Sequence, residues 1–548
     1  MATTSVETEP RDEAEPAVPA AARHPRWTGF LAGAVAAGAA LAFGELIEGA
    51  SDDIPSLVVA VGELIVDYTP GDAVATSIET LGTNQKPVLL TGITITAFVL
   101  GAILGDLSNR RHRLIGPIGF GLFGLLGGWT AARNPLSPAF ASWLTGLAAA
   151  ALGAAVLWYL LSRLDRTAGS STDSLEEPTD PRASRRAFLV YAGGMSAGAA
   201  VLVGAGRQLR GKSAAETARE TIDVSSGGSA ATTSVTESNT EAIADLAVLD
   251  EDPFGISSYI TPNDDFYRID TALTVPQVDP ADWSLRFTGM VDNPFELTLD
   301  EILAMDLEEH VVTLSCVSNE VGGNLVGNAN WTGVPLSVLL DRAGVQDGAT
   351  QVVGRSVDDF TAGFPTDVVF DGRNTLLAVG MNGEPLPTRH GFPARLVVAG
   401  LYGYVSAVKW IEEIHLTRWE DFDGYWVPRG WSKDGPMKTQ SRIDVPRRGL
   451  DIVAGPTAVA GVAWAPTRGI RSVEISIDDG PWQPCELGEA LGDESWVQWK
   501  TTWDAPVGEH SIRVRATDGT GEVQPLGPAP PRPDGAEGYH TVTNIRVV

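Results

Sequence analysis

The stretch MNGEPLPTRHGFPARLVVAGLYGYVSAVKWIEEI (381–414) carries most of the information about the fold. It contains one histidine, His390, and the basic residues Arg389, Arg395 and Lys409, separated by Gly and Pro turns. Arginine offers a planar fork to an anion, and lysine offers a point charge. These residues therefore predict either an anion-binding site on several loops or, taken one by one, ordinary solvated surface charges.

A lone cysteine lies upstream, in TLSCVSN (313–319), at the end of a strand-like run. Cys316 can be a nucleophile, a metal ligand or a small buried core residue. A thiolate is a soft ligand that suits a transition metal. Two cysteines in 548 residues exclude a disulfide framework, so we expect Cys485 to be a free or buried thiol.

Several motifs resemble the sulfite oxidase family of molybdopterin enzymes. They occur in family order between residues 261 and 411, which is far more specific than any single motif. The matching pieces are TPNDDFY (261–267), TLSC (313–316), WTGVPLSVLL (331–340), SVDDF (356–360), LLAVGMNGEPLPTRHGFPAR (376–395) and SAVKWI (406–411).

This resemblance implies an α+β catalytic domain that binds one molybdenum–molybdopterin cofactor. In the family the metal is held by the pterin dithiolene and one protein cysteine, which by position is Cys316. The contacts implied for the pterin or its phosphate are Asn263, Tyr267, Asp358, His390, Arg395 and Lys409. Among these, Asp359 is an alternative to its neighbour Asp358.

Two departures from the family bear on the substrate. Animal and plant sulfite oxidases follow the cysteine with Gly-Asn-Arg-Arg, whereas this chain has Val-Ser-Asn-Glu (317–320). Those enzymes also carry a Tyr shortly before MNG, where this chain has Val379. Sulfite is therefore in question as the substrate, unless Arg389, Arg429 or Arg442 supplies a positive charge from elsewhere.

The charge balance excludes nucleic acid as a partner. The chain has 39 Lys and Arg against 69 Asp and Glu, a formal net charge of −30. Phosphate would be repelled. The acidity fits a surface adapted to high salt and equally an acidic secreted surface.

The N-terminal part is predicted to cross a membrane. Four apolar segments reach the roughly 20 residues that a bilayer requires. A shorter segment, Ile54–Val66, carries Glu63 and is expected to be interfacial or re-entrant. The predicted spans are Trp27–Leu46, Pro87–Leu107, Leu114–Ala132 and Ala139–Leu161.

Charge placement predicts the orientation of these spans. Cytoplasmic loops collect Lys and Arg, and DLSNRRHR (106–113) is the most basic loop here. The acidic region 47–85 is then outside. SRRAFL (184–189), followed by the mild apolar run Ala187–Gly206, resembles a twin-arginine export signal, with simple positive-inside anchoring as the alternative. Both place residues 207–548 outside the cell membrane.

The chain divides into five parts. Strand-like alternation in SVEISI (472–477) and HSIRVRAT (510–517) predicts a C-terminal β-sandwich, and the resemblance implies an immunoglobulin-like domain that forms dimers. The parts are a disordered cytoplasmic tail (1–25), a transmembrane region of about five spans (26–206), a linker (207–250), the molybdopterin domain (251–425) and the immunoglobulin-like domain (436–548).

The sequence leaves two function hypotheses. The first is a membrane-anchored, extracytoplasmic molybdopterin oxidoreductase that transfers an oxygen atom to or from a small sulfur compound or similar substrate. The second is a non-catalytic surface binding protein on the same scaffold. None of the seven histidines lies in a predicted span, so we expect no haem in this chain and a separate electron-transfer partner.

Overall fold

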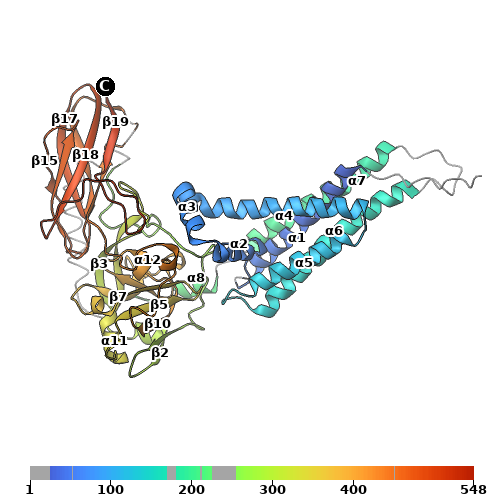
Figure 1. Cartoon of the computed structure of the whole chain (residues 1–548), viewed down its shortest axis with the longest axis horizontal. Helices are drawn as coiled ribbons and strands as arrows, with labels where there is room; N and C mark the ends of the chain where they lie inside the picture. The colour runs from blue at the N-terminus through green and yellow to red at the C-terminus, as the bar shows by residue number, and fades with distance from the viewer. Residues whose placement is uncertain are drawn as a thin grey trace, which may run out of the picture. The chain divides into compact units, whose positions relative to one another are not determined.

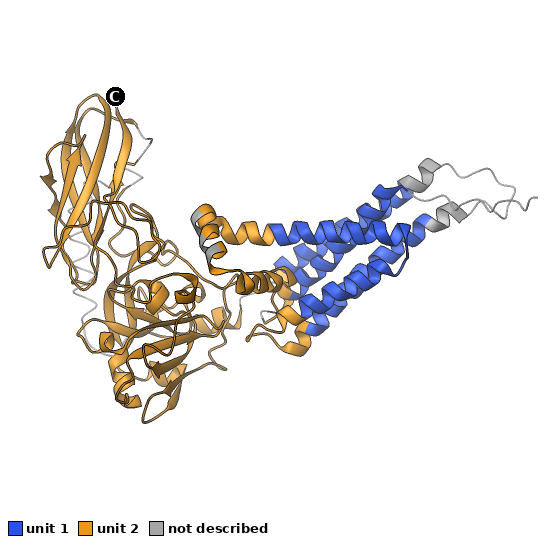
Figure 2. Ribbon diagram, viewed as in Figure 1, with its two compact units in different colours: residues 1–47, 92–128, 143–207 blue, residues 48–91, 129–142, 208–548 orange. Residues whose placement is uncertain are grey.

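The computed structural model describes most of the chain. The expected disordered tail and most of the expected linker lie outside the described residues. The chain forms two compact units: unit 1 comprises residues 1–47, 92–128 and 143–207, and unit 2 comprises residues 48–91, 129–142 and 208–548 (Figure 2). The described residues are 25–51, 53–169, 181–209, 213–224, 255–447, 449 and 451–548.

Unit 1 is built from helices (Figure 1). These apolar helices pack closely through glycine. A Cβ atom at Gly33 would lie 2.0 Å from the carbonyl oxygen of Gly101, and one at Gly105 would lie 2.2 Å from that of Gly29. Small residues of this kind let helix backbones approach one another. The helices that contribute to unit 1 are α1 (Arg26–Ala50), α4 (Gln85–Arg110), α5 (Ile115–Ala131), α6 (Ala139–Gly169) and α7 (Pro181–Leu209).

Four helices in the described part of the chain are long and apolar enough to cross a membrane. The predicted span 114–132 corresponds to α5, which has only 17 residues and is about 25 Å long. The short segment around Glu63 forms α2 (Leu57–Tyr68), whose 12 residues are too few to cross a bilayer. The four long helices are Arg26–Ala50, Gln85–Arg110, Ala139–Leu164 and the apolar part of α7 from Arg186 onwards.

Two sheets form the middle of unit 2. In the first, β1 runs parallel to β10 and the other neighbours are antiparallel. The second is antiparallel throughout. The first has the order β2 (Phe295–Thr298), β1 (Ser284–Gly289), β10 (Ile411–Thr417), β5 (Gln351–Ser356), β6 (Thr361–Pro365). The second has the order β3 (Glu308–Ser315), β4 (Val326–Pro335), β7 (Thr375–Met381), β8 (Glu384–Pro385), with β9 (Arg395–Val398) also paired to β7.

Strand β7 explains why the second sheet is buried on both faces. All seven of its residues are buried. Because successive side chains point to opposite faces, Leu377 and Val379 join one hydrophobic core while Leu376 and Ala378 join another. Three short helices complete the domain: α10 (Leu299–Leu303), α11 (Leu336–Ala343) and α12 (Gly403–Ser406).

The C-terminal part consists of two sheets over one core. Val459, Trp499 and Ile443 from one sheet and Ile475 and Val514 from the other belong to the same cluster of buried side chains. The sheets are β11 (Gln440–Val445), β13 (Gly455–Trp464), β17 (Val497–Ala505), β16 (Glu486–Leu487), and β12 (Asp451–Ile452), β19 (Thr541–Val547), β18 (Gly508–Asp518), β14 (Ile470–Ile477), β15 (Gln483–Pro484).

Buried hydrogen bonds fasten this part to the two sheets in the middle of unit 2. The Tyr259 carbonyl accepts from Trp496 Nε1 at 2.8 Å and from Asn328 Nδ2 at 3.0 Å. Thr313 Oγ1 on β3 accepts from the Trp496 backbone N–H at 2.7 Å. The strand that leads to Cys316 is therefore held from both sides.

Residues 213–224, which we expected to belong to a linker, instead fold onto the two sheets in the middle of unit 2. Helix α8 (Ala214–Arg219) is capped by Ser213, whose side chain accepts from the Glu216 N–H at 3.1 Å. Ala215 and Val224 are both buried within the hydrophobic cores around these sheets.

One buried carboxylate joins the connecting segment 437–439 to the C-terminal sheets. Asp518 is 1% exposed and accepts from Arg468 Nε at 2.9 Å, Thr439 Oγ1 at 3.0 Å and Thr520 Oγ1 at 2.6 Å. Burial alone would raise its pKa, but these hydrogen bonds outweigh burial and lower the pKa to about 2.

Asp518→Asn is expected to destabilise the protein by about 2 kcal/mol at pH 7. A carboxylate with a lowered folded-state pKa stabilises the fold above about pH 4, and this stabilisation is lost as the pH falls towards 2. Thermal unfolding of both proteins, followed by tryptophan fluorescence, should show a gap of a few degrees at pH 7 that shrinks at pH 3. A gap independent of pH would contradict this account.

Candidate cofactor site

A cavity of about 490 Å³ lies beside Cys316. Its volume is in the range of small-molecule and cofactor sites. All of its lining belongs to unit 2, although the lining residues are far apart in the sequence. They come from residues 82–86, 266–271, 316–325, 356–360, 395–410 and 426–431.

Cys316 directly follows β3, and its backbone N–H donates to the Leu325 carbonyl at 2.9 Å. Its side chain is buried and free, and burial raises the pKa of the thiol while hydrogen bonds from Ser318 oppose that rise. Cys485 is also free and lies in the C-terminal part, where burial raises its pKa to about 12. The expectation that the two cysteines do not pair is confirmed.

The surroundings of Cys316 fit a metal that arrives with its own ligands. Among the described residues, no group of three or more His, Cys, Asp or Glu side chains is arranged to hold a metal ion. A metal at the Cys316 sulfur therefore needs other donors. A cofactor that carries its own pair of sulfur ligands meets this requirement.

Arg395 is a buried cation that makes no direct ion pair in the described part of the chain, although the carboxylate of Asp270 acts on it from farther away. Its Nη1 donates to the His390 carbonyl at 3.1 Å and its Nε to the Leu396 carbonyl at 3.4 Å. The guanidinium lies 4.9 Å from the centroid of the Trp331 ring. Burial lowers the pKa of Arg395 to about 10, so it stays charged at neutral pH. A buried charge needs compensation, and an anion in the cavity would provide it.

The second cation of the cavity is Lys409, whose side chain is 12% exposed. Its Nζ pairs closely with Asp270 and donates to the Ile269 carbonyl at 3.2 Å. Burial lowers its pKa, and Asp270 opposes that effect. Residues Arg395 and Lys409 also form a β-bridge, which fixes the two charges side by side.

Tyr267 and Asp358 line the same cavity, and their contact with the cofactor remains a prediction. Burial raises the pKa of the Tyr267 hydroxyl, which keeps it a neutral hydrogen-bond donor. Burial also raises the pKa of Asp358. Asp359 does not line the cavity, and it pairs with Arg355 at 3.4 Å. The geometry thus favours Asp358 over its neighbour.

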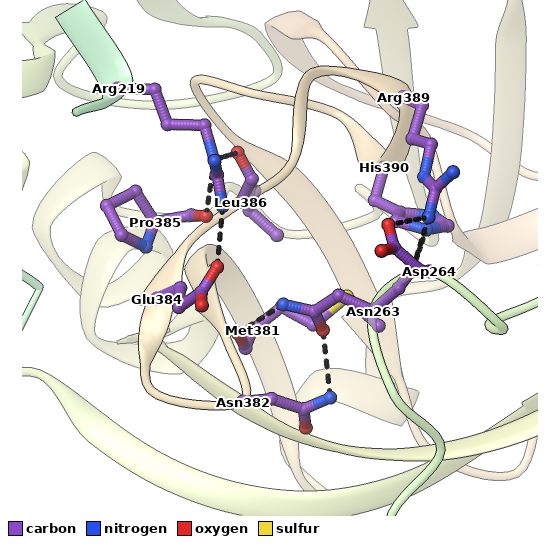
Figure 3. Close-up of polar contacts among 10 residues, drawn as sticks. All are labelled: Arg219, Asn263, Asp264, Met381, Asn382, Glu384, Pro385, Leu386, Arg389 and His390. Atoms are coloured by element: carbon purple, nitrogen blue, oxygen red, sulfur yellow. Dashed lines mark hydrogen bonds and ion pairs between the residues drawn. The ribbon is translucent and has the colours of Figure 1, made fainter. Parts of the chain in front are cut away.

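Asn263 and His390 lie together but do not line the cavity (Figure 3). His390 Nε2 meets the Asn263 carbonyl at 3.0 Å, and burial lowers the pKa of the ring to about 3. Asn382 Nδ2 donates to Asn263 Oδ1 at 2.8 Å, and Asn263 Nδ2 donates to the Met381 carbonyl at 3.3 Å. These contacts join TPNDDFY to MNG, and a direct cofactor contact remains a prediction for both residues.

Arg219 of α8 contacts the end of the hairpin formed by β7 and β8 (Figure 3). Its Nε donates to the carbonyls of Pro385 and Leu386, each at 3.0 Å, and its Nη2 pairs with Glu384 at 2.8 Å. Sequence reasoning missed this residue because it assigned the segment to a linker. The pattern Ser-x-x-Glu at 213–216 is a helix-start signal that could have revealed it.

The three arginines proposed to replace the missing substrate charge lie elsewhere. Arg389 pairs with Asp264 at 2.7 Å, Arg429 lies 3.7 Å from the Tyr425 ring centroid, and Arg442 pairs with Asp444 at 2.7 Å. None of the three lines the cavity. The cavity is instead lined by two cations that sequence reasoning did not consider, Arg268 and Lys86.

The two departures from sulfite oxidase have different structural consequences. Val379 is 2% exposed and packs in a hydrophobic core rather than in the cavity lining. Glu320 does line the cavity. It is exposed, however, so water screens its charge.

Comparison with known proteins agrees with this site. Residues 272–426 match the family described as "Oxidoreductase molybdopterin binding domain". The chain is 34% identical over 163 residues to the "Uncharacterized oxidoreductase YuiH" of Bacillus subtilis (strain 168), which covers 30% of this chain and 79% of that protein. It is 30% identical over 322 residues to human mitochondrial sulfite oxidase, covering 50% of this chain and 58% of the human protein.

A solved structure, the sulfane dehydrogenase SoxCD from Paracoccus pantotrophus, is 25% identical and covers 54% of this chain and 85% of its own, with a TM-score of 0.48, too low to support an inference. The chain spans little more than half the length of the animal sulfite oxidases that it matches. The relation to YuiH, however, covers most of that protein. The chain therefore belongs to the sulfite oxidase family of molybdopterin-binding oxidoreductases.

Proposed function

We propose that the protein is a membrane-anchored, extracytoplasmic molybdopterin-dependent oxidoreductase that performs oxygen-atom transfer on a small sulfur compound or a similar substrate. The observation that carries this proposal is the buried, free Cys316 in one cavity with the buried Arg395 and with Lys409. A non-catalytic scaffold would have no need to keep a buried cation that contacts only carbonyls and an aromatic ring and shares the more distant Asp270 with Lys409.

The residues present fit the molybdenum cofactor. Cys316 would bind the metal through its sulfur after losing its proton, as metal ligation requires. Arg395 and Lys409 would receive the phosphate, and Tyr267 and Asp358 would contact the pterin. When bound, the cofactor supplies the two-electron oxygen-atom chemistry, while the protein supplies ligation, orientation and charge.

Cys316→Ser is expected to lower the molybdenum content of the purified protein at least tenfold, because the metal loses its protein ligand. Pterin should be retained, since its contacts lie on other residues. Cys485→Ser is the matched control and should keep metal and activity. Metal analysis and pterin fluorescence measure both quantities. Equal loss of metal in the two variants would refute the assignment.

The long apolar helices support the anchoring part of the proposal. Residues 184–189 lie within α7, which continues as an apolar helix to Leu209. We propose that this segment is a twin-arginine signal-anchor that carries the catalytic domain out of the cytoplasm with its cofactor bound. Electrons would then pass to or from a separate protein, and the C-terminal sheets would form an immunoglobulin-like, dimer-forming domain.

Changing Arg185 and Arg186 together to Lys keeps the charge but should block twin-arginine export. The C-terminal part would then resist added protease in intact spheroplasts, whereas in the wild type it should be digested. An unchanged digestion pattern would support simple positive-inside anchoring instead.

We further propose that the substrate is neutral or weakly charged rather than sulfite. Residues 317–320 provide no arginine, and Glu320 adds a negative charge to the cavity lining. Because Glu320 is exposed, its repulsion of an anion amounts to no more than about 1 kcal/mol.

Steady-state assays with an artificial electron acceptor should give a kcat/KM for sulfite well below about 10⁵ M⁻¹s⁻¹. Glu320→Gln should raise this value up to about fivefold, and Glu486→Gln, at an exposed site in the C-terminal part, should not change it. Efficient sulfite oxidation by the wild type would show that the missing residues are replaced in space.

A further inference from the structure

Part of the cavity wall comes from outside the domain that the family shares. Gly82, Gln85 and Lys86 line the cavity together with Cys316. They lie where η1 (Gly82–Asn84) meets α4, nearly two hundred residues before the matched region 272–426. This wall is therefore an addition made by the segment next to the membrane helices, within the same compact unit as the catalytic domain.

The segment 71–86 contacts the catalytic domain at two points. Lys86 Nζ donates to the Ala272 carbonyl, next to the cavity residue Thr271. Gly71, the first residue of α3 (Gly71–Leu81), approaches the 3₁₀ turn η5 (Val427–Arg429) so closely that a Cβ atom would lie 2.9 Å from the Arg429 Cα. Two separate points of the segment thus touch two separate loops around the cavity.

Lys86 makes the formal charge of the cavity lining positive. The lining holds four cations, Lys86, Arg268, Arg395 and Lys409, against the carboxylates Asp270, Asp358 and Glu320. Without Lys86, cations and carboxylates would be equal in number. In a chain with a net charge of −30, one added cation makes this cavity a place for an anion.

The position of Lys86 within the cavity indicates which anion. Lys86 Nζ donates to the Ala272 carbonyl, while Lys409 Nζ donates to the Ile269 carbonyl and pairs with Asp270. The two lysines therefore both contact the stretch 269–272, so Lys86 lies on the same side of the cavity as Lys409.

We propose that Lys86 binds the phosphate of the molybdenum cofactor, so that the segment 82–86 closes one side of the cofactor cavity. This inference rests on the proposed function, because it requires that the cofactor is bound. Lys86 adds a third positive charge to those of Arg395 and Lys409 at the phosphate. It slows the release of the cofactor once the segment 82–86 is in contact with the catalytic domain.

The test uses the full-length, detergent-solubilised protein loaded with cofactor. Lys86→Gln removes the charge and keeps an N–H donor for the Ala272 carbonyl. It should release molybdenum and pterin during dialysis about tenfold faster than the wild type, as expected for the loss of one charge-assisted hydrogen bond. Lys86→Arg should restore slow release, and Lys500→Gln, on β17 of the C-terminal part, should behave as the wild type.

A second pair of variants tests the contact between α3 and η5 without changing any charged residue. Gly71→Ala should push α3 from η5 and speed cofactor release as well. Gly92→Ala is the control, because a Cβ at Gly92 meets nothing within 4 Å. Cofactor-free Lys86→Gln and wild-type proteins should melt at the same temperature and differ only when loaded, which separates ligand binding from a purely structural role.

Three results are distinguishable. A wild type that contains no molybdenum would refute the proposed function itself. A loaded wild type whose release rate is matched by Lys86→Gln would overturn the inference about Lys86. Unchanged cofactor release combined with weaker inhibition by sulfate would also overturn it, and would assign Lys86 to a substrate oxyanion instead.

Discussion

The burial of Arg395 is the constraint on which the rest of the site depends. A guanidinium removed from water loses several kcal/mol of solvation unless other groups replace it. Here two backbone carbonyls and the face of Trp331 contact the guanidinium, and Asp270, which is already paired with Arg268 and Lys409, acts on it from farther away. An anion in the cavity would add to this partial compensation, so the cavity favours a ligand that carries negative charge.

The fold holds this charge rigidly because Arg395 begins β9, which pairs with β7 between two hydrophobic cores. Lys409 is bridged to it across the backbone, and Cys316 directly follows strand β3 of the same sheet. The segment 255–260 and the C-terminal sheets then fasten β3 through Tyr259, Trp496 and Thr313. Thiol and cations are thereby fixed relative to one another by main-chain pairing rather than by flexible loops alone.

The sequence was sufficient for the parts of this site that lie in local motifs. Cys316, Arg395 and Lys409 each belong to a short, recognisable pattern, and all three meet in one cavity. The alternating pattern at 472–477 and 510–517 likewise predicted strands that pair as β14 and β18. Asn263 and His390 share those motifs, yet their side chains join two stretches of backbone outside the cavity lining, a distinction that no spacing encodes.

Lys86 and Arg219 could not be assigned from sequence for a different reason. Each is a single basic residue in a segment that composition assigned to another task, membrane crossing or linkage. Their partners, Ala272 for Lys86 and Glu384 to Leu386 for Arg219, are more than 160 residues away. Contacts of this range depend on tertiary packing, which hydrophobic periodicity does not report.

The proposed export route implies that residues 82–86 join the cofactor site only after export. If the catalytic domain folds around its cofactor in the cytoplasm, residues 82–86 cannot form the cavity wall at that time, because the loop that precedes α4 is expected on the opposite side of the membrane. The wall can form only after residues 208–548 reach that side. Lys86 would then act on a cofactor already in place, which affects how long the cofactor stays rather than which cofactor enters. The membrane region would in this way complete the site as well as anchor it.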